Sequence, residues 1–473
     1  MNSLQIAIIL REKCGFLGKI SYFCTQNMMN WQQLISNKRL GQEHRHPERH
    51  DDRTEFKRDY DRLIFSAPFR RLQNKTQVFP LPGSIFVHNR LTHSLEVASV
   101  GMSLGNDVAQ ILTQRHPELK DTMFQEIGQI VSTACLAHDL GNPPFGHSGE
   151  KAMQAYFLEG PGTELQRDVT PVFWNDLTHF EGNANAFRLL THQFKGRRPG
   201  GFVMTYSTLA SIVKYPYSSS AAGKKGKFGF FDSEKESYLK IAEELGIPCR
   251  SAMGEPLRFA RHPLVYLVEA ADDICYEIMD LEDAHKLKII SHDETMQLLL
   301  GFFDKESQQH ILQRIEEEGV TDDNEKVVYL RACVIGKLEN ECVKVFVDNE
   351  EAILSGTFQG SLIDHIGDLQ KTAYERCCSL SVTKIYKSRP VLDVELSGYQ
   401  IIHTLMQKFI GAAVHPERFY SKHLISRVSS QYHIDAPDLE TRLMAVIDYI
   451  SGMTDVYALD VYQKINGISL PIV

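Results

Sequence analysis

A helical face that runs directly into a His-Asp pair is the feature that most constrains this chain. Ile127, Val131 and Ala134 are spaced by four and three positions, the period of one helical face, and His138 continues that face. Asp139 follows at once, so an imidazole and a carboxylate meet at the end of an apolar helix. Burying both groups is costly unless each finds a partner. A metal ion is one such partner, and a hydrogen-bonded core histidine beside a helix-terminal aspartate is the alternative.

The segment 265–280 carries an aspartate inside a second apolar stripe. Asp272 lies within the stripe, where a carboxylate is costly unless a cation or a hydrogen-bond donor meets it. Asp273 instead aligns with Glu269 and Glu277 on the opposite face, which we expect to be polar and to face solvent. The stripe itself consists of Val265, Val268, Cys275 and Met279.

A third inward polar residue, His93, precedes Val97 by four positions and extends another apolar helical face. Two imidazoles and two carboxylates form a mixed nitrogen and oxygen donor set, which suits Mn, Fe, Co, Ni or Zn and, less well, Mg. We therefore predict a site for a divalent metal ion, with open positions for water and a phosphate oxygen. Its predicted ligands are His93, His138, Asp139 and Asp272.

Acid-base groups follow the His-Asp pair after a turn rich in Gly, Asn and Pro. His147 and Glu150 are three positions apart around a helix start, so their side chains can reach the same side. We predict that His147 is a general acid assisted by Glu150. The alternative interpretation is an N-cap at Ser148 with a glutamate in the first turn. Arg90, one helical turn before His93, is positioned to bind a phosphate beside the metal.

The order His, then His-Asp, then a distant Asp resembles the signature of the HD-domain metal-dependent phosphohydrolases. Longer matches are similar to the bacterial deoxyguanosine triphosphate triphosphohydrolase (dGTPase) family, and the resemblance runs from about Met29 to near the C-terminus. A His-Asp dipeptide alone is weakly specific, whereas five blocks in the same order are strongly specific. The blocks are residues 58–79, 90–97, 138–150, 269–276 and 448–455.

This resemblance implies hydrolysis of a deoxynucleoside triphosphate, with dGTP as the first candidate, to the deoxynucleoside and inorganic triphosphate. It places Gln77 and Tyr276 at the deoxyribose, where Tyr276 excludes a 2′-hydroxyl, and it places Asp280 at the 3′-hydroxyl. Lys214 is a candidate partner of the outer phosphates. Members of the family commonly assemble as hexamers and can bind single-stranded DNA, so the resemblance also implies a homo-oligomer.

Two other functions compete with this one. The first is another HD phosphohydrolase activity, either a nucleotide monophosphatase or a cyclic nucleotide phosphodiesterase, and the second is a regulatory nucleotide or single-strand DNA binder without turnover. The net charge of -9 argues against a generally basic nucleic-acid binder but leaves room for local basic patches. The nine cysteines form no Cys-x-x-Cys pair, which is typical of reduced thiols in a cytoplasmic protein. The sequence contains neither a candidate transmembrane segment nor a Gly-rich nucleotide-binding motif.

Helical periodicity along most of the chain predicts an all-α fold. We expect an HD-domain core over residues 29–290 and a helical C-terminal region, residues 291–473, packed on that core. Residues 1–28 precede the family-like blocks and are predicted to be an extension without an assigned role.

Two stretches depart from this helical pattern. Residues 382–395, interrupted by Pro390, favour a short extended ribbon. Residues 195–229 are rich in Gly, Pro, Ser and Lys and predict a mobile loop. The lysines of that loop either contact a polyphosphate or nucleic acid or only make the loop soluble.

Overall fold

The computed structural model describes residues 28–43, 51–80, 87–223, 226–252 and 254–470. Within these ranges the chain is built of helices, and backbone pairing of the β type is limited to isolated bridges. The prediction of an all-α fold is thereby confirmed. Apart from its last residue, the predicted N-terminal extension lies outside the described ranges.

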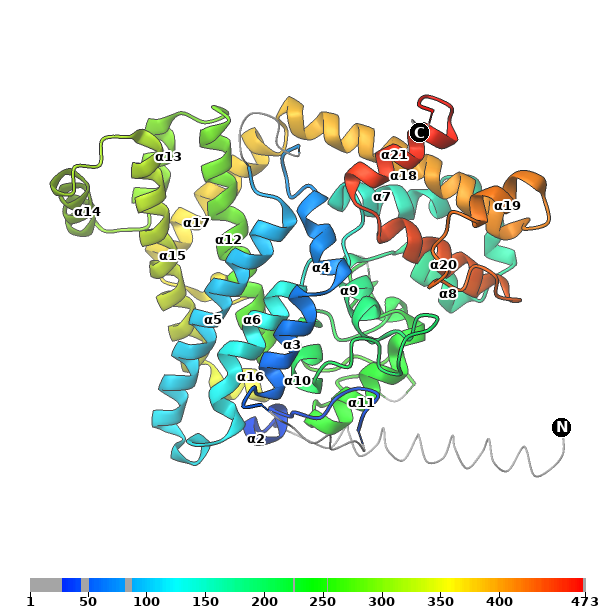
Figure 1. Cartoon of the computed structure of the whole chain (residues 1–473). Helices are drawn as coiled ribbons and strands as arrows, with labels where there is room; N and C mark the ends of the chain where they lie inside the picture. The colour runs from blue at the N-terminus through cyan, green and yellow to red at the C-terminus, as the bar shows by residue number, and fades with distance from the viewer. Residues whose placement is uncertain (1–27, 44–50, 81–86, 224–225, 253, 471–473) are drawn as a thin grey trace.

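The α-helices carry the labels of Figure 1 and follow one another along the chain. They are α2 (Trp31–Leu34), α3 (Glu55–Ile64), α4 (Ala67–Arg71), α5 (Arg90–Arg115), α6 (Ile127–Ala137), α7 (Gly146–Leu158), α8 (Pro171–Thr178), α9 (Gly182–Thr191), α10 (Tyr206–Ile212), α11 (Lys235–Leu245), α12 (Leu264–Lys286), α13 (His292–Leu300), α14 (Lys305–Glu317), α15 (Asp323–Asp348), α16 (Glu350–Leu354), α17 (Asp368–Leu380), α18 (Arg389–Val414), α19 (Phe419–Ile425), α20 (Leu439–Ser451) and α21 (Asp455–Ile465).

Three neighbouring helices, α5, α6 and α12, form the centre of the fold (Figure 1). The start of α5 is fixed by Asn89, whose side chain accepts hydrogen bonds from the backbone of Leu91 and Thr92, while the Thr92 hydroxyl accepts from the Asn89 N–H. In α6 every residue except Gln129 is buried, as expected for a helix surrounded by others. The His-Asp pair that follows α6 is therefore carried into the middle of the protein.

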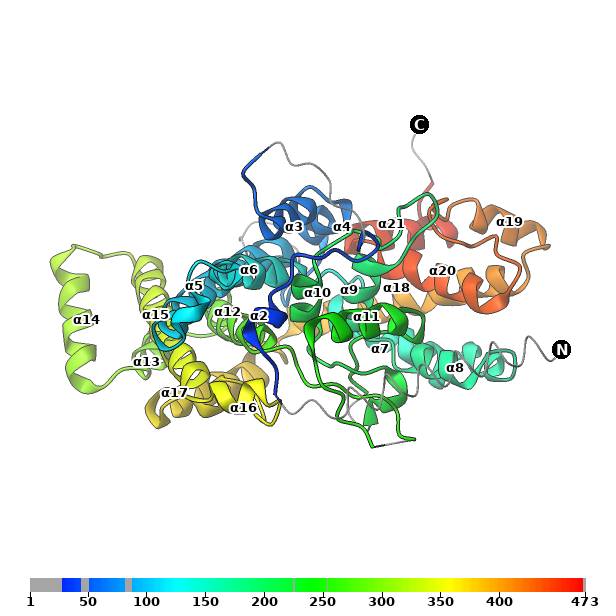
Figure 2. The ribbon, with the colours of Figure 1, turned by 90° about the horizontal axis from the view of Figure 1, so that it is seen from below.

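A second apolar core joins helices that are far apart in the sequence. Here α7 packs on α8 and α18, and α18 also packs on α20 and α21. Figures 1 and 2 both place these helices together on one side of the molecule. The C-terminal region also contributes to the first core, through apolar residues of α13, α15 and α17. A domain boundary at residue 290 stays a prediction.

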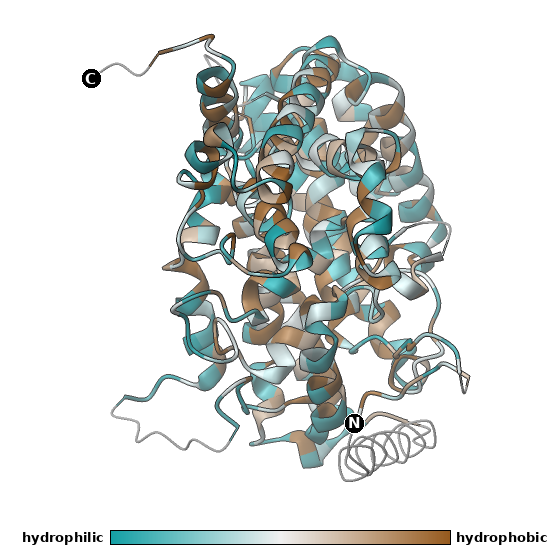
Figure 3. Cartoon of the chain, turned by 90° about the vertical axis from the view of Figure 1, so that its right-hand side faces the viewer, coloured by the Kyte–Doolittle hydropathy of each residue, from teal (hydrophilic) through white to brown (hydrophobic). Residues whose placement is uncertain are grey.

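The helices carry apolar and polar residues on different faces, which appear as brown and teal patches along the ribbons of Figure 3. Burial of the apolar faces explains why a chain of many medium-length helices forms two continuous cores. Among the helices of the described ranges, none has both the length and the apolarity needed to cross a lipid bilayer.

The predicted extended ribbon over residues 382–395 is wrong. Ser381–Ile385 is a π-helical turn, and α18 begins at Arg389. Pro390 lies in the first turn of α18, where the missing N–H of proline costs no hydrogen bond. The β-branched residues of this stretch favoured a strand, but packing against α12 decides the outcome.

The predicted loop over residues 195–229 is wrong for its middle part. α10 lies there, and each of its residues is buried. Thr205 caps the helix by accepting a hydrogen bond from the Thr208 N–H. Because α10 is buried all round and contains serine and threonine, it has no polar face from which periodicity could reveal it. Lys224 and Lys225 of the same stretch lie outside the described residues.

Candidate active site

Three of the four predicted metal ligands meet between α5, the end of α6 and α12. Asp272 Oδ1 lies 3.1 Å from His93 Nε2 and 3.4 Å from His138 Nε2. One ligand atom from each of the three residues lies within 4.8 Å of the other two. The His138 Nδ1–H donates to the Cys135 carbonyl at 2.6 Å, so Nε2 is the nitrogen that faces the cluster. Two imidazole nitrogens and a carboxylate oxygen in this arrangement fit a divalent transition-metal ion.

The charges of this cluster support one another against the cost of burial. Burial lowers the pKa of His138, but Asp139 and Asp272 outweigh it and raise that pKa to about 9. Burial raises the pKa of Asp272, but His138 and His93 outweigh it and hold that pKa well below the usual value. Asp272 is therefore ionised and needs a positive charge beside it, carried by the imidazoles or by a metal ion.

Asp139, the fourth predicted ligand, flanks this cluster. Its Oδ1 is 3.7 Å from His138 Nε2 and accepts a hydrogen bond from Asn142. Its Oδ2 accepts from Arg90 Nη1 at 2.7 Å, and Arg90 is only 6% exposed. Gly146 makes room for this arginine, because a Cβ there would lie 2.5 Å from Arg90 Nη2. Asp139 thus fixes the guanidinium that is predicted from the sequence to bind a phosphate.

The predicted acid-base pair lies at the start of α7. His147 Nδ1 is 3.2 Å from Glu150 Oε2, and the imidazole is 68% exposed, so an incoming ligand can reach it. Glu150 is buried, and its Oε1 accepts the Gly182 N–H at 2.8 Å. Burial would raise the pKa of Glu150, but His147 and Lys227 outweigh it and lower that pKa. A charged carboxylate thus faces the imidazole and can orient it.

These groups open into one cavity of about 290 Å³. Two lysines enter it, with Lys214 Nζ 3.0 Å from Glu269 Oε1 and Lys227 Nζ 2.7 Å from Glu181 Oε2. Gln77 also lines the cavity, and its buried Oε1 has no hydrogen-bond partner among the residues that the structure describes. A ligand with an N–H or O–H group can therefore satisfy Gln77. Other residues that line the cavity are Arg90, His138, Asp139, His147, Glu150, Asp272 and Tyr276.

Tyr276 and Asp280 lie at different depths. Tyr276 lines the cavity, with its ring centroid 6.3 Å from that of His93. Asp280 is 4% exposed and lies behind the lining, where its Oδ2 accepts the Tyr386 hydroxyl at 2.9 Å. Burial holds the pKa of Asp280 well above the usual value. A ligand hydroxyl must therefore displace or join Tyr386 before it can bind this carboxyl group.

Comparison with known proteins matches two stretches of the chain to family models. The HD domain model covers residues 90–199, and the model named phosphohydrolase-associated domain covers residues 372–464. A deoxyguanosinetriphosphate triphosphohydrolase-like protein of Pseudomonas aeruginosa is 38% identical over 94% of this chain and all of its own length. The deoxyguanosinetriphosphate triphosphohydrolase of Yersinia pseudotuberculosis is 30% identical over 87% of this chain and 93% of its own length.

The chain belongs to the deoxyguanosinetriphosphate triphosphohydrolase family. It is an HD-domain enzyme, a triphosphohydrolase, as the resemblance in the sequence blocks implied. The HD match contains His93, His138, Asp139 and His147, whereas Asp272 comes from α12 beyond it. The site of this family member is thus completed by a helix outside the matched domain.

One prediction about α12 in this triphosphohydrolase is wrong. The face that carries Asp273, Glu269 and Glu277 does not point to solvent. Glu277 is 4% exposed and accepts the Ser381 hydroxyl at 2.7 Å, and burial raises the pKa of Asp273 to about 7. The physical reason is that α12 packs on α5, α6, α15 and α17, so that most of the helix surface outside the cavity is covered. Periodicity cannot distinguish two faces when both are covered.

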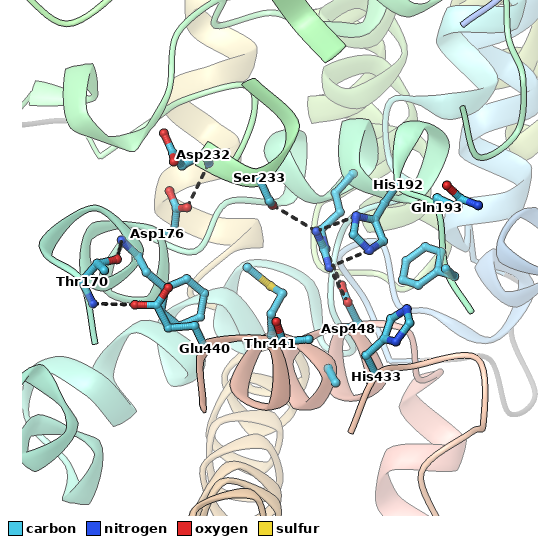
Figure 4. A pocket seen from close by; sticks show the side chains of 15 residues that line it. Thr170, Asp176, His192, Gln193, Asp232, Ser233, His433, Glu440, Thr441 and Asp448 are labelled. Atoms are coloured by element: carbon cyan, nitrogen blue, oxygen red, sulfur yellow. Dashed lines mark hydrogen bonds and ion pairs between the residues drawn. The ribbon is translucent and has the colours of Figure 1, made fainter. Parts of the chain in front are cut away.

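A second cavity, of about 440 Å³, lies between α8, α9 and α20 (Figure 4). Asp448, Ser233 and His192 converge there on the Arg188 guanidinium, which also donates to Glu234 at 2.6 Å. Both oxygens of Asp448 accept from this arginine at 2.8 Å. These contacts join α9 to α20. The charged residues of this cavity therefore serve as a buried ion pair that links the two helices.

Sequence reasoning missed several residues around the triphosphohydrolase site. Tyr386 lies in the stretch predicted to be extended, so its contact with Asp280 was not expected. Asn142 lies in the turn after α6, for which the sequence indicated no side-chain role. Lys75 and Asp455 lie inside the family-like blocks, and this resemblance is the feature of the sequence that could have drawn attention to them. Helical periodicity does not place either residue on a face directed at the site. Both contact the turn after α6, through the Asn142 carbonyl and the Phe145 N–H respectively.

Proposed function

We propose that this enzyme hydrolyses a deoxynucleoside triphosphate, with dGTP as the preferred substrate, to the deoxynucleoside and inorganic triphosphate. The observation that carries the proposal is that His147 and Glu150 line the same cavity as His138 and Asp272, the two members of the metal-ligand cluster that face it. A metal-ligand set beside an acid-base pair is the combination that phosphate ester hydrolysis requires. The names of the relatives support the choice of dGTP.

We infer that His93, His138 and Asp272 hold a divalent metal ion, with Asp139 beside them as a fourth candidate ligand. Such an ion, when bound, supplies Lewis-acid polarisation of a phosphoryl oxygen and lowers the pKa of water. The mixed nitrogen and oxygen donor set suits Mn, Fe, Co, Ni or Zn better than Mg. The charge balance of the cluster supports a cation at this point.

Cationic side chains of the cavity suit a triphosphate. Arg90 is fixed by Asp139 near the metal ligands, and Lys214 and Lys227 enter the cavity from the segment that follows α10. Guanidinium and ammonium groups pair with phosphate oxygens at short range. We propose that Arg90 binds the phosphate next to the scissile bond and that Lys214 binds the outer phosphates.

Bond cleavage requires a proton for the departing oxygen. Water adds its oxygen to the α-phosphorus, the bond from phosphorus to O5′ breaks, and O5′ leaves as the hydroxyl of the deoxynucleoside. We propose that His147 donates this proton, with Glu150 holding the imidazole in its protonated form. Tyr276 and Gln77 would contact the deoxyribose, and Asp280 would bind the 3′-hydroxyl after release from Tyr386.

The test is a product-resolved assay with the purified full chain. Each deoxynucleoside triphosphate is incubated with Mn²⁺ or Mg²⁺ in ¹⁸O-labelled water, and the products are separated and weighed by mass spectrometry. We expect deoxynucleoside and triphosphate, with the label in triphosphate. Release of diphosphate, or label in the nucleoside, would contradict the proposed bond. Lys214→Met is expected to raise KM for a triphosphate, whereas an enzyme specific for monophosphates or cyclic nucleotides would be unaffected.

We further propose that the enzyme forms homo-oligomers, hexamers by family resemblance, and we keep single-stranded DNA as a candidate partner. Exposed apolar side chains on α18, such as Leu396 at 71% exposure, support an association surface. Light scattering coupled to size-exclusion chromatography tests the first statement, and a fluorescence binding assay with an oligonucleotide tests the second.

A further inference from the structure

A buried aspartate at the start of α21 connects two parts of the active site. Asp455 is 5% exposed, and its two oxygens accept hydrogen bonds from two separate backbone segments. Oδ2 accepts the Thr76 N–H at 2.7 Å, and Oδ1 accepts the Phe145 N–H at 2.9 Å. Burial of a carboxylate is costly, and two N–H donors offset part of that cost. Its position is therefore tied to both segments at once.

Both donors are close neighbours of residues that line the cavity. Thr76 directly precedes Gln77, and Phe145 stands two positions before His147. Phe145 has φ +61°, a left-handed conformation that is unfavourable for a non-glycine residue and persists only where the surroundings hold it. The hydrogen bond to Asp455 is one such constraint. This hydrogen bond fixes the backbone immediately before α7, and the orientation of that backbone determines where the His147 side chain lies.

A second contact joins the same three segments. Lys75 is 3% exposed, and its ammonium group donates to the carbonyl oxygens of Asn142 and, at 3.1 Å, of Ser451. Residues 75–76, 142–145 and 451–455 are thus linked by two buried side chains of opposite charge, an arrangement we call the clasp. None of the four hydrogen bonds of the clasp involves the side chain of a predicted metal ligand, although Asn142 also donates to Asp139.

We propose that Asp455 is a positioning residue for the hydrolytic reaction, which fixes His147 opposite Gln77 by accepting the Phe145 and Thr76 N–H groups together. The inference rests on the proposed function, since it assigns His147 the role of general acid. According to this proposal, a residue of the C-terminal helices affects catalysis without contacting the substrate.

Asp455→Asn tests the proposal because the amide keeps the size of the side chain but has a single acceptor oxygen. One of the two N–H groups then loses its partner, and the turn before His147 shifts. We expect kcat to fall about 10- to 100-fold, the scale for displacing a catalytic group by near 1 Å. Asp455→Glu, which keeps both acceptors, should fold and lose less of kcat. Asp460→Asn on the exposed side of the same helix is the matched control and should leave kcat unchanged.

A double-mutant comparison separates positioning from general support of the fold. If Asp455 acts through His147, adding Asp455→Asn to His147→Ala should lower the residual rate by less than about twofold. The imidazole that Asp455 positions is already absent from that background. An equal loss in both backgrounds would overturn the proposal, as would an unchanged kcat of Asp455→Asn in the folded protein.

Hydrogen exchange read by mass spectrometry gives a measurement that does not depend on turnover. Peptides covering residues 139–150 should exchange faster in Asp455→Asn, or in Asp455→Glu if the first variant does not fold, than in Asp460→Asn. Unchanged exchange there would refute the clasp itself. If the wild-type chain releases no triphosphate while this exchange difference is present, the proposed function fails and the structural link stands.

Discussion

Removing Arg188 is predicted to destabilise the enzyme more than removing its partner Asp448. Arg188 is 4% exposed and donates two hydrogen bonds of 2.8 Å to Asp448 and one of 2.6 Å to Glu234. The Arg188 guanidinium therefore pairs with two buried carboxylates. Arg188→Leu removes this cation from both, although His192 still lies 3.1 Å from Glu234, whereas Asp448→Asn leaves Arg188 paired with Glu234.

The expected magnitudes follow from these contacts. Breaking a buried ion pair by removing one partner costs about 3–5 kcal/mol, and we expect Arg188→Leu at the upper end of that range because two carboxylates are affected. For Asp448→Asn we expect about 1–3 kcal/mol, since the amide oxygen still accepts one hydrogen bond. The free energy of unfolding is measured by urea titration with far-UV circular dichroism.

The pH dependence of the free energy of unfolding provides a second check, through the contact of Arg188 with Glu234. Burial raises the pKa of Glu234, but Arg188 and His192 outweigh it and hold that pKa below its ordinary value of 4.5. A carboxylate with a lowered pKa stabilises the fold above its unfolded pKa and loses this contribution as the pH falls through the folded one. The cost of Arg188→Leu should therefore be constant above pH 4.5 and shrink as the pH falls below 4.5. Equal costs for the two variants, or a cost that does not vary with pH, would refute the reasoning.

Three further outcomes are expected. Gly141→Ala should lower both the unfolding midpoint and kcat, because its Cβ would lie 2.1 Å from two backbone atoms around α9, whereas Gly411→Ala, with nothing within 4 Å, should change neither. Asp272→Asn should abolish turnover and leave the purified chain with little bound metal, and a full metal content by mass spectrometry would contradict the assigned ligand set. Burial lowers the pKa of His88, but its contacts with Asp283 and Glu96 outweigh burial and raise that pKa to about 10. The contribution of protonated His88 to stability is therefore complete below the ordinary pKa of 6.5 and is lost as the pH rises through about 10. The melting temperatures of wild type and His88→Gln should therefore differ most below pH 6.5 and converge near pH 10, and a constant gap would argue against the assignment.

Amphipathic periodicity was informative where a helix has one covered face. It placed His93, His138 and Asp272 on inward faces, and the structure brings these three side chains together. Their roles remain predictions, because position alone does not establish metal binding. Periodicity failed for the Glu269 and Glu277 face of α12, because these glutamates are buried as ion pairs or hydrogen-bonded groups instead of facing solvent.

The contacts that the sequence could not reveal are those made by backbone groups and by distant segments. The pairing of Asp139 with Arg90 depends on the turn at Gly146, where the absence of a side chain leaves room for the guanidinium. Tyr386 reaches Asp280 because residues after α17 form a π-helical turn, and local β propensity indicated a strand instead. Tertiary packing decided both cases.

The bond between Phe145 and Asp455 spans 310 positions of the sequence. On a ribosome the turn that carries His147 would emerge long before Asp455 is synthesised, and contacts of such separation form late because a long loop must first close. We therefore expect a nascent or prematurely terminated chain that lacks α21 to hold His147 loosely, because the hydrogen bond from Phe145 to Asp455 is missing. Hydrolysis of cellular nucleotides would begin only after nearly the whole polypeptide has been made.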